Sequence, residues 1–337
     1  MKILITGGCG FVGSNLCFYL LSNLKIKNLL IETVDNLKKK SSIINSKRLQ
    51  RKKITNYKLD VSKKNSFKKL KKYDLIIDCC AEPAVEISKK KPDKVLATNL
   101  IGTLNTIEKA RKDNSKIIFI STSRVYPIKN TYDYLRKKKE FDENNNLDGI
   151  KSLYGYSKIT SEMLIEEYSY AFNLDYLIIR SGLITGPWQF GKVEQGLISL
   201  WIIKHIFRQK LSYIGFNGTG KQIRDVLFIE DFCEFILISI KKFKSVKNKT
   251  FCIGGGKKNK INLKELTNYC QKITKNKIKI DKIKKTSNYD IPYFVAKNQK
   301  AMDFLKWRPK TNIRDTIIKT YNWINLNKKL IKKYYNE

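Results

Sequence analysis

Residues 3–14 read ILITGGCGFVGS, and this stretch decides the fold. An apolar run typical of a β-strand leads directly into four closely spaced glycines, and a helical pattern begins at Ser14. Such glycines let the backbone turn tightly and approach a pyrophosphate, whose charge then lies at the N-terminus of the following helix. An ordinary glycine-rich turn is the alternative. The expected dinucleotide contacts in this stretch are Gly7, Gly10, Phe11, Val12 and Gly13.

Asp35 ends the second predicted strand, about twenty residues beyond the glycines. A carboxylate there can accept hydrogen bonds from the adenosine ribose and repel a 2′-phosphate, which favours NAD over NADP. Asp60 follows another short strand and either caps the adenine pocket or begins a turn. Further cofactor contacts are expected from Asn36, Val61, Ala81 and Asn99.

The first half of the chain alternates short apolar runs with longer amphipathic segments, which predicts right-handed βαβ units and a parallel sheet. The predicted strands span residues 3–6, 29–34, 74–80 and 116–121. After residue 178, glycine-rich turns separate shorter elements. The expected fold class is therefore α/β, with a Rossmann-type doubly wound parallel sheet and a smaller mixed α/β C-terminal substrate lobe.

We expect residues 1–180 to form the NAD-binding domain and residues 181–337 to form mainly the substrate lobe, with segments near residues 226–253 returning to the first domain. The lysine-rich residues 129–149 are expected to be a surface loop. Residues 312–335 have helical spacing and are expected to end the fold as one amphipathic helix.

The composition narrows the class of protein. The chain has 337 residues and a formal net charge of +38, from 68 Lys and Arg against 30 Asp and Glu. These cations are scattered rather than gathered into one stripe, so we expect solvated faces that attract an anionic substrate, and neither a nucleic-acid nor a membrane partner. No stretch of 18 or more apolar residues occurs, and glycines interrupt the apolar N-terminus, so no signal peptide is expected.

Cysteine and histidine usage limits the chemistry further. Seven cysteines occur without a CxxC pair, which predicts a reduced, cytoplasmic protein. His205 is the one histidine and lies in an apolar helical stretch. Histidine-based metal sites and catalytic triads are therefore not expected, and no metal is predicted.

Residues 154–158 read YGYSK, which places Tyr154 and Lys158 one helical turn apart. A lysine there can lower the phenol pKa, and an oxidised nicotinamide adds a second positive charge nearby. Tyr154 could then act as the general base that removes a hydroxyl proton during hydride transfer. A chance pair on a helix surface is the alternative, but the glycine motif and the predicted strand ending at residues 121–123 precede it in the chain.

The motifs TGGCGFVG (residues 6–13), STSRVY (residues 121–126) and YxxxK, in this order, resemble the extended short-chain dehydrogenases over essentially the whole chain. The resemblance implies that Thr122 is the catalytic Ser/Thr, that Tyr154 transfers the proton and that Lys158 also holds the nicotinamide ribose. It further implies a homodimer built on helices near residues 94–112 and 154–172.

The residues after Thr122 narrow the reaction. In the 4,6-dehydratases of this family Asp-Glu follows the Ser/Thr, and UDP-glucuronate-type decarboxylases carry Glu just before Val-Tyr. Ser123 and Arg124 stand at these positions here. The resemblance thus favours oxidation and hydride return over elimination of water, and epimerisation or plain dehydrogenation remains.

In the C-terminal half, GPWQFGK (residues 186–192), EQG (residues 194–196) and GTGKQIRD (residues 218–225) resemble the CDP-paratose 2-epimerase (tyvelose epimerase) branch of this family. Arg224 is expected to bind the substrate diphosphate, because a guanidinium matches phosphate oxygens. A structural pair with Asp225 or Asp231 is the alternative. Further expected sugar or phosphate contacts are Gln189, Lys192 and Gln195.

Two departures from the family pattern border the expected nicotinamide and sugar. Leu183 stands where many members have Asn, and Glu82-Pro83 follows Ala81 where relatives often have Gly or Gln. The leading expectation is NAD-dependent epimerisation of a nucleotide sugar through a transient ketone, with C2 as the branch-specific carbon. The alternatives are a UDP-sugar 4-epimerase, a net NAD-dependent reductase, and a basic NAD- or RNA-binding regulatory protein.

Overall fold

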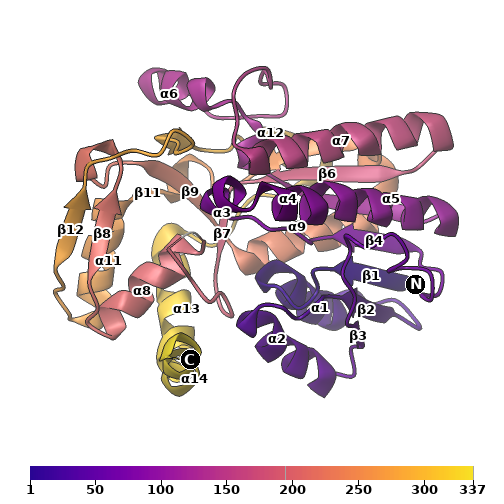
Figure 1. The fold of residues 1–337 in the computed structure, drawn as a ribbon, viewed down its shortest axis with the longest axis horizontal. Helices are drawn as coiled ribbons and strands as arrows, with labels where there is room; N and C mark the ends of the chain where they lie inside the picture. Colours follow the sequence, from indigo (N-terminus) through magenta and orange to yellow (C-terminus); the bar gives the residue numbers. More distant parts are fainter. Residues whose placement is uncertain (194, 337) are drawn as a thin grey trace.

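The apolar runs of the first half form one parallel sheet at the centre of the molecule (Figure 1). The computed structural model describes residues 1–193 and 195–336, and within them seven strands pair in the order β10-β6-β5-β4-β1-β2-β3. The strands are β1 (Lys2–Thr6), β2 (Leu30–Val34), β3 (Asn56–Tyr57), β4 (Leu75–Asp78), β5 (Lys116–Thr122), β6 (Tyr176–Ser181) and β10 (Lys249–Ile253). The predicted α/β class with a Rossmann-type sheet is confirmed.

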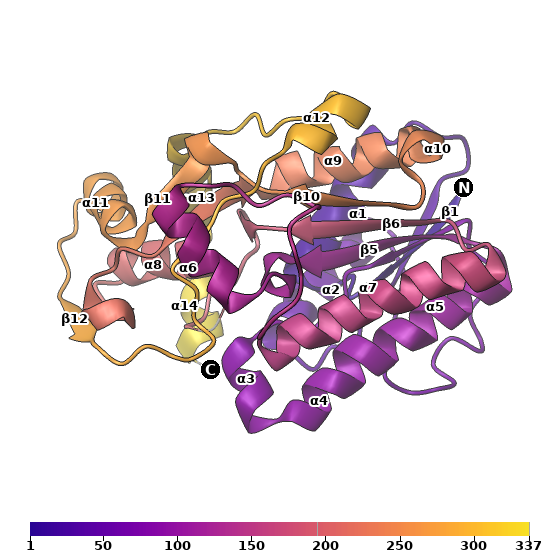
Figure 2. The ribbon, with the colours of Figure 1, turned by 90° about the horizontal axis from the view of Figure 1, so that it is seen from above.

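Alternate residues of each central strand pack on opposite faces of the sheet, because side chains of a strand alternate. Ile3 and Ile5 belong to one apolar core, and Leu4 belongs to another. Figure 2 shows α5 and α7 side by side on one face, with α9 on the other. The helices of the Rossmann half are α1 (Phe11–Asn23), α2 (Lys40–Arg51), α3 (Val85–Lys90), α4 (Pro92–Leu96), the π-helix η1 (Ala97–Ile101), α5 (Gly102–Asp113) and α7 (Leu153–Phe172).

The C-terminal half builds a smaller mixed lobe around a separate apolar core. One of its sheets contains β7 (Leu183–Thr185), β9 (Ile223–Phe228), β11 (Lys260–Asn262) and β13 (Tyr293–Phe294), and another pairs β8 (Leu211–Ile214) with β12 (Ile280–Ile283). The 3-10 turns of this half are η3 (Phe216–Gly218) and η4 (Lys257–Asn259), whereas η2 (Ser123–Val125) directly follows β5 of the large sheet. The helices are α8 (Leu197–Ile206), α9 (Ile229–Lys241), α10 (Phe243–Val246), α11 (Leu263–Thr274), α12 (Gln299–Leu305), α13 (Ile313–Leu326) and α14 (Lys328–Asn336). After β9 the chain goes back to the large sheet through α9, which packs on α1, and β10, which pairs with β6.

Two expectations about local structure are wrong. Residues 129–149 are not one loop, because α6 (Ile128–Lys137) occupies their first part; its Tyr134 ring packs 4.4 Å from the Phe141 ring, measured between centroids. The C-terminal segment forms two helices rather than one. They separate at Asn327, which lets Tyr334 of α14 turn back onto Phe190, with ring centroids 4.5 Å apart.

The most apolar helices are buried within the fold or too short to span a membrane. His205 is fully buried in α8, where its Nδ1 lies 2.8 Å from the Trp201 carbonyl oxygen. Over the described part of the chain, every helix is too short or too polar to cross a bilayer.

Candidate active site

A cleft of about 910 Å³ lies where the carboxyl ends of the central strands face the C-terminal lobe. In parallel α/β sheets this edge is where ligands bind. Residues after β1, β4, β5 and β6 line one side, and residues of α8, β8 and β9 line the other.

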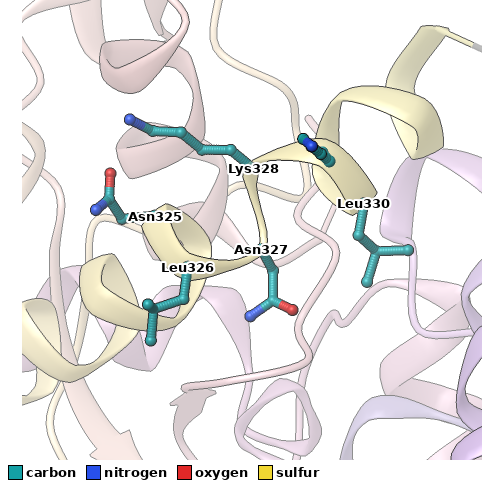
Figure 3. A pocket seen from close by; sticks show the side chains of 6 residues that line it. Asn325, Leu326, Asn327, Lys328 and Leu330 are labelled. Atoms are coloured by element: carbon teal, nitrogen blue, oxygen red, sulfur yellow. The ribbon is translucent and has the colours of Figure 1, made fainter.

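A smaller hollow of about 430 Å³ lies at the junction of α13 and α14 and shares no lining residue with the cleft (Figure 3). It is formed by the single segment of residues 325–330, which offers neither a carboxylate nor a hydroxyl. We therefore assign the chemistry to the larger cleft.

The glycine loop brings backbone to the cleft. Gly7 has φ of +61°, and a Cβ there would lie 2.8 Å from the Cys80 Cα, while a Cβ on Gly13 would lie 2.5 Å from the Gly7 carbonyl oxygen. Helix α1 starts after Gly10, and no side chain within the described residues caps it. Its first N–H groups are thus available to an anion. The expected contacts Gly7, Gly10, Phe11, Val12 and Gly13 all line the cleft.

Asp35 ties the glycine loop to the end of β2. Its Oδ2 accepts a hydrogen bond from the Cys9 N–H at 3.2 Å, and its Oδ1 accepts one from the Leu37 N–H at 2.9 Å. Burial raises the pKa of Asp35, although these hydrogen bonds oppose that shift. Asp35 does not itself line the cleft, but Lys39 and Ser42, which interact with its carboxylate, do.

Asp60 begins a turn, as the structural alternative expected. Burial would raise its pKa, but hydrogen bonds from Lys38 and Ser62 outweigh burial and hold the pKa at about 2. Asn36 donates a hydrogen bond to the same carboxylate at 3.5 Å. Val61 is buried against Gly102 of α5. Asn36, Asp60 and Val61 do not line the cleft.

Asn99 organises the loop that follows β4. Its Oδ1 accepts the Glu82 N–H at 2.7 Å, and its Nδ2 donates to the Glu82 carbonyl at 3.2 Å and to Ser157 Oγ at 3.1 Å. The amide therefore holds this loop against α7. Ala81, one residue earlier, lines the cleft. Glu82, a departure from the family pattern, is fixed by ion pairs with Lys39 and Lys94.

Tyr154 lies in the first turn of α7, and the structure brings it beside Thr122 at the end of β5. The Ser152 side chain caps α7 by accepting the Gly155 N–H at 3.2 Å. Gly155 allows this approach, since a Cβ there would lie 2.3 Å from the Arg124 carbonyl oxygen. Both Tyr154 and Thr122 are buried and line the cleft.

Burial raises the pKa of Tyr154, while a hydrogen bond with Thr122 and the positive charge of Arg124 lower it. The sequence-based expectation gave the lowering to Lys158. In the structure the groups that lower it are Thr122 and Arg124, and the Lys158 Nζ lies over the Phe119 ring, 3.8 Å from the centroid.

Lys158 is buried, and its Nζ has no hydrogen-bond acceptor among the described residues. Burial lowers its pKa, and the nearby charge of Asp78 opposes this. A buried ammonium without a hydrogen-bond acceptor is costly, and the Phe119 ring supplies none. Hydroxyls of a nicotinamide ribose would supply acceptors, so this orphaned cation beside the glycine loop fits NAD.

Arg224 projects from β9 into the cleft. Its Nη1 donates to the Ile223 carbonyl at 2.8 Å and its Nη2 to the Ile291 carbonyl at 2.6 Å, and it pairs with Asp290 at 3.6 Å. Burial and the charge of Arg124 lower its pKa to about 10, with Asp290 opposing. The expected alternative partners, Asp225 and Asp231, bind backbone N–H groups elsewhere.

The other expected substrate residues lie at different depths. Gln189 lines the cleft, but its amide already bonds Thr185, Ser199 and the Ile184 carbonyl. Lys192 lies outside the cleft lining, with its Nζ 5.9 Å from the Tyr334 ring centroid. Gln195 is exposed and lines the cleft. Glu194 of the EQG motif lies outside the described residues.

Sequence reasoning missed the contribution of Arg124 and of residues 289–290. From the sequence, position 124 shows only that the acid of the dehydratases is absent. In the structure Arg124 lines the cleft, and its Nη1 donates a hydrogen bond to the Tyr289 carbonyl at 2.8 Å. Residues 289 and 290 lie in a segment without regular secondary structure. No motif marks them, so the sequence carried no signal for this contact.

Known proteins resemble the chain over nearly its whole length. It is 29% identical to the CDP-paratose 2-epimerase of Salmonella typhi, with 96% of this chain and 99% of that protein covered, and 27% identical to the UDP-glucuronate 4-epimerase of Thermodesulfobacterium geofontis, with 98% of each covered. Pal from Bacillus thuringiensis, a solved structure, superposes with a TM-score of 0.82 at 27% identity, covering 97% of this chain and 99% of that one.

The UDP-glucuronic acid 4-epimerase from Bacillus cereus, solved with UDP-glucuronic acid and NAD, shares the fold with a TM-score of 0.79 at 22% identity, over 97% of this chain and 99% of that one. The model of the NAD dependent epimerase/dehydratase family matches residues 3–254. Together with the glycine loop and the residues around Tyr154, this match shows that the chain belongs to the NAD dependent epimerase/dehydratase family and uses NAD as its cofactor.

Proposed function

We propose that the protein epimerises a nucleotide-diphosphate sugar by oxidising one sugar carbinol to a ketone and reducing that ketone from its other face. The observation that carries this proposal is the pair Thr122 and Tyr154 in the cleft lining beside the glycine loop, with the unpartnered Lys158 ammonium buried one helical turn beyond Tyr154. A binding protein without catalysis has no need of this buried set.

The residues divide the work as follows. Tyr154 accepts the hydroxyl proton and later returns it, Thr122 holds the phenol by a hydrogen bond, and the unpartnered Lys158 ammonium would hold the ribose hydroxyls of bound NAD. Bound NAD supplies the hydride acceptor and donor. The proton and the hydride both return to the sugar, so the reaction has no net redox change.

The cleft favours epimerisation over elimination of water. Ser123 and Arg124 line it at the positions where the dehydratases carry Asp-Glu. Neither a hydroxyl nor a guanidinium is suited to protonate a leaving hydroxyl near neutral pH.

We assign the substrate diphosphate to Arg224, whose guanidinium is mostly buried in the cleft wall. The exposed Gln195 is the best-placed sugar contact, followed by Gln189 in the cleft lining and by the exposed Lys192 outside it. Similarity to the CDP-paratose 2-epimerase supports a CDP-linked sugar and reaction at C2. Similarity to a UDP-glucuronate 4-epimerase supports reaction at C4 of a UDP-sugar as the second candidate.

Incubation of the purified protein with CDP- and UDP-hexoses, followed by NMR, tests this function. We expect one new diastereomer, and deuterium placed at the reacting carbon should remain in the product. Entry of solvent deuterium at that carbon would show deprotonation instead. Stoichiometric consumption of added NADH would identify a reductase.

NAD is assigned to residues 1–180 with segments near 226–253, and the sugar mainly to residues 181–337. Within the first unit, Asp35 is the proposed selector of NAD over NADP, because a 2′-phosphate would meet its carboxylate. Titration of the unmodified protein with both dinucleotides tests this role. NADP binding as tight as NAD binding would remove it.

A homodimer through α5 and α7 and a cytoplasmic location complete the proposal. These two helices lie side by side, and α7 together with η1, which precedes α5, exposes apolar side chains: Ile101, Met163, Tyr170 and Phe172. A surface of this kind favours association. All seven cysteines are free, which agrees with a reducing compartment. Light scattering tests the dimer, and cell fractionation tests the location.

A further inference from the structure

Two guanidiniums, Arg124 and Arg224, approach one carboxylate in the cleft. Arg224 pairs with Asp290 at 3.6 Å, and Arg124 bonds the carbonyl of the preceding residue, Tyr289, at 2.8 Å. The three charges act on one another: Asp290 raises the pKa of both arginines, and the charge of Arg124 lowers that of Arg224. At the cleft surface these three side chains carry two positive charges against one negative charge. The buried Asp225 also raises the pKa of Arg224, but its carboxylate accepts hydrogen bonds from the Gly256 and Ala296 N–H groups.

This excess of buried positive charge selects an anionic ligand. Bringing two guanidiniums together away from water is unfavourable unless an anion compensates them. Among the described residues, the Arg124 guanidinium has one hydrogen-bond acceptor, the Tyr289 carbonyl, so further N–H donors remain for a ligand. A guanidinium presents its donors as a fork that matches phosphate oxygens.

The position of Arg124 decides which phosphate it would bind. Its backbone N–H donates to Thr122 Oγ1 at 3.2 Å, and its carbonyl packs against Gly155, the neighbour of Tyr154. The reacting sugar carbon must face Tyr154. The phosphate nearest to Tyr154 is therefore the one bonded to the sugar, and the nucleoside-side phosphate lies further away.

We infer that Arg124 is a second phosphate-binding residue, which holds the sugar-side phosphate of a nucleoside diphosphate while Arg224 holds the nucleoside-side phosphate. This assignment rests on the proposed function. It predicts that the cleft distinguishes a nucleoside diphosphate from its monophosphate mainly through Arg124.

Calorimetric titration of the NAD-loaded protein tests the assignment without relying on turnover. The ligand is whichever of CDP, UDP, dTDP or GDP the unmodified protein binds most tightly, together with its monophosphate. Arg124→Met should weaken diphosphate binding by roughly 10- to 100-fold, the scale of a lost charged hydrogen bond, and change monophosphate binding by less than about twofold. Arg124→Lys should recover part of the loss, since the charge remains without the fork.

Arg136→Met is the matched control, because Arg136 is an exposed arginine on α6 that pairs with Asp133. It removes the same charge from the molecule and should leave both affinities unchanged.

Three results would overturn the assignment, each for a different reason. Equal losses of diphosphate and monophosphate affinity in Arg124→Met would show that Arg124 only anchors residues 289–290. Unchanged diphosphate affinity, with a pH profile of turnover moved to higher pH, would show that Arg124 acts on Tyr154 alone. Failure of the unmodified protein to bind any of the four diphosphates would remove the proposed substrate class, and this assignment with it.

Discussion

The loop after β1 presents backbone to the cleft, whereas the opposite wall, built from β9 and residues 289–291, presents charged side chains. In the loop, Gly7 and Gly13 pack so closely that a Cβ on either would meet another backbone atom within 3 Å. In the opposite wall, Arg224 and Asp290 make the contacts that a ligand would rearrange.

The difference shows which kind of binding site a single sequence reveals. A binding site made of backbone needs glycines at fixed spacing, so its sequence motif is continuous and can be recognised in a single sequence. A side-chain site collects groups from distant segments: Arg124 meets Tyr289 across 165 residues, and Arg224 meets Ile291 across 67. Its signature is scattered along the chain.

The largest effect is expected at Tyr154, where the two walls meet. Tyr154→Phe keeps the ring but removes the proton acceptor, so kcat should fall by roughly 10²- to 10⁴-fold. Single-turnover assays by NMR measure the loss. Folding and NAD binding should survive, because the ring and its packing are kept. A fully active variant would show that another group moves the proton.

A substitution that disturbs only the glycine loop after β1 should weaken NAD binding. In Gly13→Val, the Cβ would lie 2.5 Å from the Gly7 carbonyl oxygen and 2.7 Å from the Gly8 Cα, so the loop must shift. We expect a cost of about 3 kcal/mol, or roughly 100-fold in NAD affinity. Fluorescence titration with NAD measures it. Nucleoside diphosphate affinity serves as the internal control and should change little. Equal losses for both ligands would mean that the two walls are not separate.

Breaking the side-chain wall should give the reciprocal pattern. Arg224→Ala removes a charged hydrogen-bond donor and should weaken nucleotide-sugar binding by about 1 to 3 kcal/mol while sparing NAD. Calorimetry with each ligand measures both affinities. Unchanged sugar-nucleotide affinity would assign Arg224 to a purely structural role with Asp290.

The smallest expected effect concerns pH. Tyr154 must be deprotonated to act as a base, and the hydrogen bond with Thr122 lowers its pKa. Thr122→Val removes that bond and raises the phenol pKa, so the acid limb of the kcat profile should move to higher pH. At a pH below the phenol pKa, each unit by which the pKa rises leaves about tenfold less deprotonated Tyr154. Thr131→Val, a buried threonine on α6, should leave the profile in place. An unmoved limb in Thr122→Val would separate Thr122 from the base.

The sheet and the glycine loop could be predicted from the sequence because their signals are local. Alternating apolar runs and spaced glycines mark βαβ units directly, and the observed strands match the predicted ones to within a few residues. The assignment of α6 to a loop failed because the lysine run at residues 137–139 and the asparagine run at residues 144–146 follow it directly, while its contact with Phe141 depends on tertiary packing.

The candidate site was predictable only in part. The structure brings Thr122 and Tyr154 together, but their catalytic roles, like those of the substrate contacts, stay predictions. Asn99 was expected at the cofactor, yet its amide is occupied by Glu82 and Ser157. Such occupancy depends on which segments pack against a side chain, and a residue's own neighbours in sequence do not encode it.

The return of the chain to the large sheet through β10 has a consequence for biosynthesis. Tyr176, at the start of β6, and Asn248, just before β10, are hydrogen-bonded but lie 72 residues apart. At about 5 to 20 residues per second, a ribosome needs roughly 4 to 15 seconds to make the intervening segment. During that interval the nascent chain has an unpaired edge at β6, which can pair with another chain. Chains truncated between β6 and β10 should therefore aggregate. The β6 edge of the nascent chain needs protection, for example by a chaperone, until β10 has been synthesised.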